Sequence, residues 1–155
     1  MKIELEPLDV AHVAPLRTLH QQPGVTKWWG PMEPDFPFDE AESLRFAIVV
    51  DGTVAGLVQY GEEKWQDNRH GWIDIFVGDD YTGRGIGTEV MRRAIRVLLE
   101  ERGHHRITID PAVENLAAIR CHEKAGFRRV GVLERSYREP SSGEWRDELL
   151  MELVV

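Results

Sequence analysis

The chain has 155 residues, 42% of them hydrophobic and 30% charged, a composition that favours one domain spanning residues 1–155. A net charge of −8 argues against general nucleic-acid binding, and no apolar run reaches the roughly 18 residues of a membrane span. The start Met1-Lys2-Ile3-Glu4 does not resemble a signal peptide and the single cysteine excludes an internal disulfide, so we expect a cytoplasmic protein.

The charges are unevenly distributed along the chain. Nine acidic residues and only two basic ones lie between Trp29 and Asp67, whereas six arginines and three glutamates lie between Thr82 and Arg106. The first region suits a cationic partner and the second an anionic one, unless both are simply solvated surface.

Hydrophobic periodicity and turn residues predict alternating strands and helices in the first half of the chain. We expect two tryptophans, Trp28 and Trp29, in an irregular, partly extended segment, where neighbouring side chains face opposite sides; one of them is then free to line a cleft, or both pack against the body. The predicted elements are a strand at 3–8, a helix at 10–22, an extended segment at 25–31, a short helix at 39–44, and strands at 45–50, 53–60 and 72–77.

The second half of the chain predicts two further helices and three strands. Gly103 and Gly126 stand where glycine commonly ends a helix. The predicted elements are helices at 84–102 and 115–125 and strands at 106–110, 127–133 and 148–154. The order of elements indicates an α/β (α+β) fold, a mixed sheet with helices on it.

A glycine-rich stretch, Gly83-Arg84-Gly85-Ile86-Gly87, stands where a strand gives way to the long helix. Glycine permits positive φ and close approach of a ligand, and the free N–H groups of a first helical turn attract anions. We interpret Arg84, Gly85, Ile86, Gly87 and Thr88 as a pyrophosphate-binding loop. The alternative is a tight turn without a ligand, while the missing lysine and third glycine exclude a P-loop and a dinucleotide fingerprint.

This loop, with the stretch Asp110–Asn115 and the pattern Glu123-Lys124-x-Gly126-Phe127, resembles the GNAT superfamily of N-acetyltransferases. The resemblance implies a mostly antiparallel mixed sheet of six to seven strands with about four helices. It also implies acetyl-CoA as co-substrate, held by the glycine loop, by Asn115 and by the backbone near Phe76 and Val77. The pairs Trp28-Trp29 and Asp110-Pro111, with Asp74, are most similar to the aminoglycoside 6′-N-acetyltransferases.

Asp74 is the candidate general base, since it is the one ionisable residue in an otherwise apolar strand. On the sequence alone an outward-facing surface position is the alternative, and the resemblance favours the catalytic one. Asp110 ends its strand at Pro111 and either binds a polyamine with Asp74 or accepts hydrogen bonds in a local turn.

His122 lies seven residues after Asn115, on the same helix face, and stands where the family carries the tyrosine that protonates the leaving thiolate. We expect it to act as that acid or, failing this, to be a packed histidine. Trp28, Trp29 and Trp65 are candidate walls for the acceptor. No metal is expected.

The first functional hypothesis is direct acetyl transfer to a primary amine of a small polycation, foremost the 6′-amine of aminoglycoside antibiotics, which implies resistance. One alternative is a relative acting on a polyamine, a peptide N-terminus or a hydroxylysine-type siderophore precursor. The other is a non-catalytic CoA-binding regulator. We expect a monomer or homodimer with no nucleic-acid or membrane partner.

Overall fold

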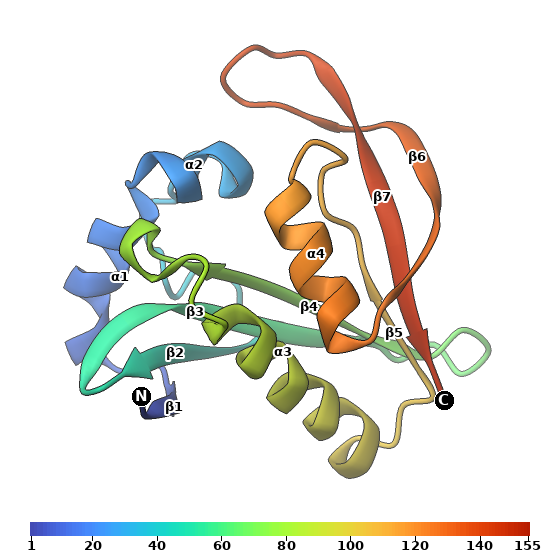
Figure 1. The fold of residues 1–155 in the computed structure, drawn as a ribbon, viewed down its shortest axis with the longest axis horizontal. Helices are drawn as coiled ribbons and strands as arrows, with labels where there is room; N and C mark the ends of the chain where they lie inside the picture. Colours follow the sequence, from blue (N-terminus) through green and yellow to red (C-terminus); the bar gives the residue numbers. More distant parts are fainter.

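The computed structural model describes residues 1–155 and contains one seven-stranded sheet with helices on both faces (Figure 1). The strands are β1 (Ile3–Pro7), β2 (Leu44–Val50), β3 (Thr53–Glu63), β4 (His70–Val77), β5 (Arg106–Ile109), β6 (Arg128–Arg138) and β7 (Trp145–Val154). The α-helices are α1 (Val13–His20), α2 (Pro23–Trp29), α3 (Ile86–Arg96) and α4 (Leu116–Ala125). Short 3₁₀ turns η1 (Val10–His12) and η2 (Asp79–Tyr81) and a π turn η3 (Val97–Glu101) complete the elements.

The sheet order is β1-β2-β3-β4-β5-β7-β6, and every neighbouring pair is antiparallel except β4 and β5. These two parallel strands are paired only at Gly71–Ile107 and Trp72–Thr108. Beyond Trp72 they diverge, and α4 lies beside the opening (Figure 1). The divergence leaves one edge of β4 without a strand partner in its second half.

The central strands bury side chains on both faces of the sheet. One cluster joins Ile48, Val58 and Ile73 to the apolar side of α3, and the other joins Ala47, Leu57 and Phe76 to α1 and α2. Because side chains alternate along a strand, each strand contributes to both clusters. The sheet thereby fixes the end of β4 between α3 on one face and α1–α2 on the other.

A bulge in β3, where Ala55 has no partner on β2, determines which residues face one another across the sheet. The register shifts between Ile48 and Val49, so Arg45 lies opposite Gln59 instead of its neighbour Val58. Gln59 in turn lies opposite Asp74. The three polar residues form a straight row on the α1–α2 face of the sheet.

The predicted fold class is confirmed, but two local predictions are wrong. The segment around Trp28 and Trp29 is the helix α2, which starts with Pro23 in its first turn. Residues 39–40 are irregular and residues 41–43 form bends, not a helix. Arg45 of β2 donates to the Asp39 carboxylate and to the Pro37 carbonyl, and these bonds tie the start of the segment to the sheet.

Other boundaries differ by a few residues from the predicted ones. The helical segment at 10–22 divides into η1 and α1, and β6 and β7 extend well beyond the predicted ranges. None of the helices has both the length and the apolar character needed to cross a bilayer.

Candidate active site

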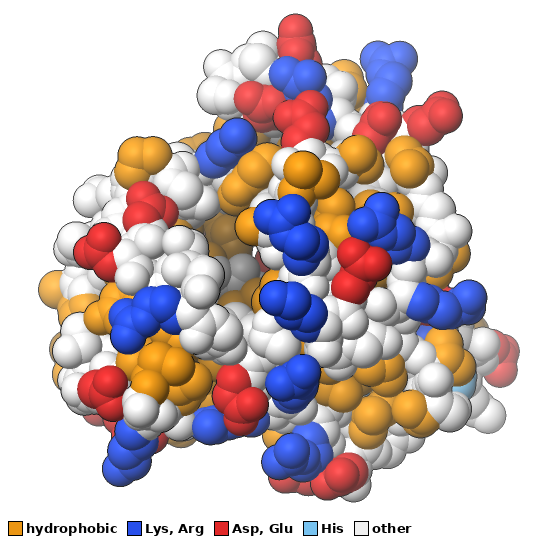
Figure 2. Space-filling model, viewed as in Figure 1, with side chains coloured by type: hydrophobic (Ala, Val, Ile, Leu, Met, Phe, Trp, Pro, Cys, Tyr) orange, Lys and Arg blue, Asp and Glu red, His pale blue; other side chains and the backbone are white.

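A cleft of about 1150 Å³ opens where β4 and β5 diverge. It is visible as a hollow in the molecular surface, with a column of Lys and Arg side chains beside it over α3 and α4 (Figure 2). All but two of the predicted site residues line the cleft. Those that line it are Trp28, Trp29, Asp74, Phe76, Val77, Asp110, Gly85, Ile86, Gly87, Thr88, Asn115 and His122. The exceptions are Trp65 and Arg84.

One end of the cleft is formed by the start of α3. Gly85 is the N-cap residue and no side chain caps the helix, so the N–H groups of the first turn are available to a ligand. Gly83 and Gly85 adopt φ values of +73° and +80°, which side chains tolerate poorly. A phosphate group placed there would meet backbone donors and the positive end of the helix dipole.

Gly87 has a different role from the two glycines before it. A Cβ atom on Gly87 would lie 3.3 Å from Sγ of Cys121, so this glycine allows α3 and α4 to pack closely. The α4 helix begins with Asn115 as N-cap, whose side-chain oxygen accepts the N–H of Ala118 at 3.2 Å. The predicted cofactor role of Asn115 is thus combined with a structural one.

The Arg84 side chain does not line the cleft, although the sequence analysis placed this residue in the pyrophosphate-binding loop. Its guanidinium lies over the Tyr81 ring, 5.4 Å from the centroid, and approaches the Met1 sulfur. Arg120 and Lys124 of α4 do line the cleft, as does Arg45 of β2. The two α4 cations flank Cys121, whose sulfur lies 3.5 Å from the Thr88 hydroxyl. They sit near the glycine loop, where a negatively charged ligand would gain from them.

Asp74 lies in the middle of β4 and presents its carboxylate to the cleft. The side chain is open to the cleft but enclosed by protein, and this loss of bulk water raises its pKa to about 6. The neighbouring Asp110 raises the pKa further. Hydrogen bonds from the Ile75 N–H and the Gln59 amide and the charge of Arg45 act in the opposite direction.

Two further carboxylates, Asp110 and Glu148, stand across the cleft from β4. Loss of water raises the pKa of both, and the charge of Asp110 adds to the increase at Glu148. The Leu149 N–H donates to the Pro111 carbonyl, which holds Glu148 beside the end of β5. Three carboxylates with raised pKa values in one cleft favour a cationic ligand, whose charge would offset their repulsion.

His122 lines the cleft but is 4% exposed and packs at the edge of the Phe127 ring. Burial lowers its pKa to about 4, so the imidazole is neutral at neutral pH, and its Nδ1 has no hydrogen-bond partner. An imidazolium donor is therefore not favoured. This environment favours the second of the two expectations for His122, a packed histidine.

The aromatic residues at the other end of the cleft come from α2 and its surroundings. The Trp29 indole N–H donates to the Ile75 carbonyl at 3.4 Å, and its ring contacts Phe76 edge to face. Trp28 also lines the cleft, with the Lys27 ammonium over its ring. Trp65, by contrast, is 67% exposed in the β3–β4 loop and does not reach the cleft, so the expected three-tryptophan wall is reduced to two.

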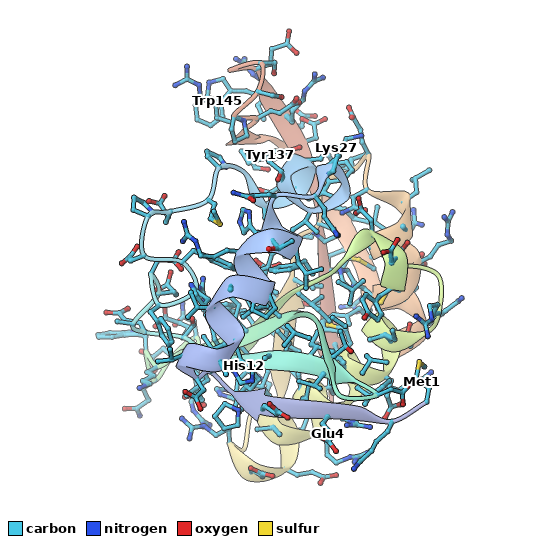
Figure 3. All side chains as sticks on the ribbon, turned by 90° about the vertical axis from the view of Figure 1, so that its left-hand side faces the viewer. Met1, Glu4, His12, Lys27, Tyr137 and Trp145 are labelled. Carbon is cyan, nitrogen blue, oxygen red and sulfur yellow. The ribbon has the colours of Figure 1, made fainter.

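Several cleft residues were missed by the sequence analysis, among them Gln59, Arg45, Tyr137 and Glu148. Glu148 carried a weaker signal than Asp74, because Asp147 precedes it directly and Glu152 is a second charge in the same strand. Tyr137 follows a register break in β6 at which Arg135 adopts a φ of +50°. Near this point the β6–β7 hairpin approaches α2, as the positions of Tyr137 and Lys27 in Figure 3 illustrate.

No group of three or more His, Cys, Asp or Glu side chains could hold a metal ion. The cleft instead combines an anion-binding helix start at one end with carboxylates and aromatic rings at the other. Such a site suits a group transfer between an anionic carrier and a cationic acceptor.

The sequence profile of the acetyltransferase (GNAT) family matches residues 13–127. The chain therefore belongs to this family. The fold agrees: spermidine N-acetyltransferase from Vibrio cholerae, solved in complex with CoA and spermine, superposes with a TM-score of 0.80 at 22% identity, covering 98% of this chain and 95% of that one.

Two relatives share a shorter segment with the chain. The aminoglycoside N(6′)-acetyltransferase type 1 of Klebsiella pneumoniae is 35% identical over 72 residues, which are 46% of this chain and 36% of that protein. The kanamycin resistance protein of Rhizobium radiobacter is 43% identical over 75 residues, 48% of this chain and 69% of that protein. The chain thus matches little more than a third of the length of the Klebsiella relative.

Proposed function

We propose that the chain is an acetyl-CoA-dependent N-acetyltransferase that modifies a primary amine of a small polycation, foremost the 6′-amine of an aminoglycoside. The observation that carries the proposal is the two-ended cleft, with the uncapped α3 start at one end and Asp74, Asp110 and Glu148 at the other. The activities of the Klebsiella and Rhizobium relatives support the choice of acceptor.

The cofactor end of the cleft fits coenzyme A. The first turn of α3 offers N–H donors to a diphosphate, and Arg120 and Lys124 supply positive charge nearby. The unpaired half of β4 offers backbone groups to an extended amide chain of the kind that links the diphosphate to the thioester. The thioester would then arrive near Phe76 and Val77.

Asp74 acts first on the acceptor. With a pKa of about 6 it is ionised at neutral pH, attracts the acceptor's ammonium group and takes up its proton, directly or through one water. The neutral amine attacks the thioester carbonyl, whose oxygen accepts a backbone N–H from the end of β4. The attacking nitrogen gives up its second proton to solvent, and collapse of the tetrahedral intermediate breaks the C–S bond, which leaves the amide and a thiolate.

The thiolate then takes up a proton. Because the thiol has a pKa of about 8.5, solvent readily protonates the thiolate near neutral pH. His122 also lines the cleft, but its low pKa leaves the ring neutral at neutral pH and disfavours it as the proton donor. Water therefore donates the proton to the thiolate, and His122 has the packing role that its burial indicates.

Release of the CoA thiol, measured with acetyl-CoA and a panel of amines, tests the proposal. We expect turnover with kanamycin, and mass spectrometry should locate one acetyl group on the 6′-amine. Turnover with none of the amines, despite acetyl-CoA binding, would leave a CoA-binding regulator as the better description.

A second candidate function is acetylation of a linear polyamine. The three carboxylates would bind a chain of ammonium groups as readily as an amino sugar, and the Vibrio neighbour was solved with spermine. A kcat/KM for spermidine above that for kanamycin in the same assay would favour this function.

A further inference from the structure

We propose that Gln59, with its side-chain amide oriented by Arg45, is the positioning residue that holds the Asp74 carboxylate for proton removal. The inference rests on the proposed function in that it assigns Asp74 the role of base. It begins with the cross-strand row: Arg45 of β2, Gln59 of β3 and Asp74 of β4 lie directly opposite one another. The next row on the same face is apolar and consists of Ala47, Leu57 and Phe76.

The direction of the Gln59 amide is determined by chemistry. The Arg45 Nε lies 2.7 Å from Oε1 of Gln59, and a guanidinium can only donate hydrogen bonds. The atom that faces Arg45 must therefore be the amide oxygen, and the amide nitrogen faces Asp74, 3.5 Å from Oδ2. Gln59 is 8% exposed, and the Ser43 hydroxyl also donates to Oε1 at 3.4 Å, a second contact that the oxygen accepts on this side.

Arg45 is itself held firmly. Its side chain is 7% exposed, and its Nη1 donates to Asp39 at 2.5 Å and to the Pro37 carbonyl at 2.9 Å, while the guanidinium lies over the Phe36 ring. Asp39 balances the charge of Arg45. The guanidinium is thus fixed by the segment that follows α2, and its Nε is left for Gln59.

As a result, the two oxygens of the Asp74 carboxylate accept hydrogen bonds from two different neighbours. Oδ1 accepts the Ile75 N–H at 3.0 Å and Oδ2 accepts the Gln59 amide. A donor-only contact favours the ionised carboxylate. The other charged groups that act on Asp74 are Asp110 of the β5 end, which opposes ionisation, and Arg45 of β2, which favours it.

The test measures the Asp74 carboxylate directly by ¹³C NMR titration, without reliance on turnover. We expect the Asp74 pKa to rise by about half a unit in Gln59→Met, which keeps the size of the side chain and removes the donor. Gln59→Glu should raise it further because it adds a negative charge. Gln66→Met, in the exposed β3–β4 loop, is the matched control and should leave it unchanged.

Kinetics supply the second measurement. In Gln59→Met we expect the acidic limb of kcat/KM to move to higher pH together with the NMR value. The limiting kcat should fall about tenfold, while the acetyl-CoA KM stays unchanged. Thermal melting shows whether the variants are folded.

The outcomes separate the two proposals. An Asp74 pKa that is the same in wild type, Gln59→Met and Gln59→Glu would overturn the positioning role of Gln59, whatever the activity. A shifted NMR titration in a protein that acetylates no amine would support the positioning contact and refute the proposed function instead.

Discussion

At the scale of single residues, the central feature is a carboxylate whose proton affinity is raised by its surroundings. Asp74 is enclosed by the cleft and faces Asp110, and both effects oppose ionisation. Groups with such raised pKa values cluster at sites that transfer protons or bind cations. The kinetic and thermodynamic consequences can be tested in one variant.

Replacing Asp74 with Asn should lower kcat/KM by about 10²-fold or more, the usual scale for a lost acid–base group. The acidic limb near pH 6 in the wild-type profile should disappear with it. Steady-state kinetics between pH 5 and 9 measure both effects. Near-normal turnover would remove Asp74 from the role of base.

The same variant should be more stable than the wild type at neutral pH. The pKa of Asp74 is about 6 in the folded protein and 3.8 in the unfolded chain, so the folded state binds its proton more tightly. Stability then falls as pH rises from about 4 to 6, and the loss is complete above pH 6. Asp74→Asn should raise Tm at pH 7.5 and lose that advantage near pH 4, as measured by thermal unfolding.

His122→Phe tests the proton donor. Because burial lowers the pKa of His122 to about 4, we expect a loss in kcat below about tenfold and no change in the shape of the pH profile from 6 to 9. A loss of 10²-fold or more on the acidic side of that range, where a proton donor is still protonated, would restore the donor role.

At the scale of elements, the start of α3 combines backbone conformation with ligand binding. Gly85 and Gly103 both have positive φ, +80° and +72°, and a Cβ on either would meet no atom within 4 Å. They differ in place, because Gly85 lines the cleft and Gly103 follows the π turn. Alanine variants at the two positions therefore distinguish the effect of backbone strain from an effect on ligand binding.

Gly85→Ala and Gly103→Ala should each destabilise the protein by about 1 kcal/mol through the left-handed backbone. Only Gly85→Ala should raise the KM for acetyl-CoA. Thermal melts and steady-state kinetics on both variants provide the measurement. An equal rise in KM for both would indicate that general destabilisation, not the loop, is responsible.

Much of the fold was predictable from local signals, and the failures have physical causes. The strand before the glycine loop and the helix after it were predicted because periodicity and turn glycines agree there. The α2 helix was missed because the four prolines between residues 23 and 37 suggested an extended chain, although the one within α2, Pro23, is well tolerated in a first turn. The opposition of Arg45 and Gln59 was not predictable, because a one-residue bulge sets it.

At the scale of the whole molecule, the site is assembled from segments far apart in the chain. Asp74 and Glu148 come from β4 and β7, Asp110 directly follows β5, and Trp28 and Trp29 come from a helix on the opposite side of the cleft. Sequence reasoning identified Asp74 and Asp110 by local context. It could not exclude Trp65, since only the tertiary structure places the β3–β4 loop away from the cleft.

Trp29→Ala and Trp65→Ala form a matched pair. Trp29 lines the cleft and donates to the Ile75 carbonyl, so its loss should raise the acceptor KM severalfold, on the scale of a lost aromatic contact. Trp65→Ala should leave both KM values unchanged. A rise in acceptor KM for Trp65→Ala would mean that the loop moves to the cleft during turnover.

The two residue pairs that join β4 to β5 leave the sheet divided along most of that seam. The pantetheine arm of the co-substrate would then act as a missing strand, bridging amides that otherwise face water. Acetyl-CoA should consequently stiffen the protein, slowing hydrogen–deuterium exchange from Ile73 to Val77 and leaving the β2–β3 hairpin unaffected.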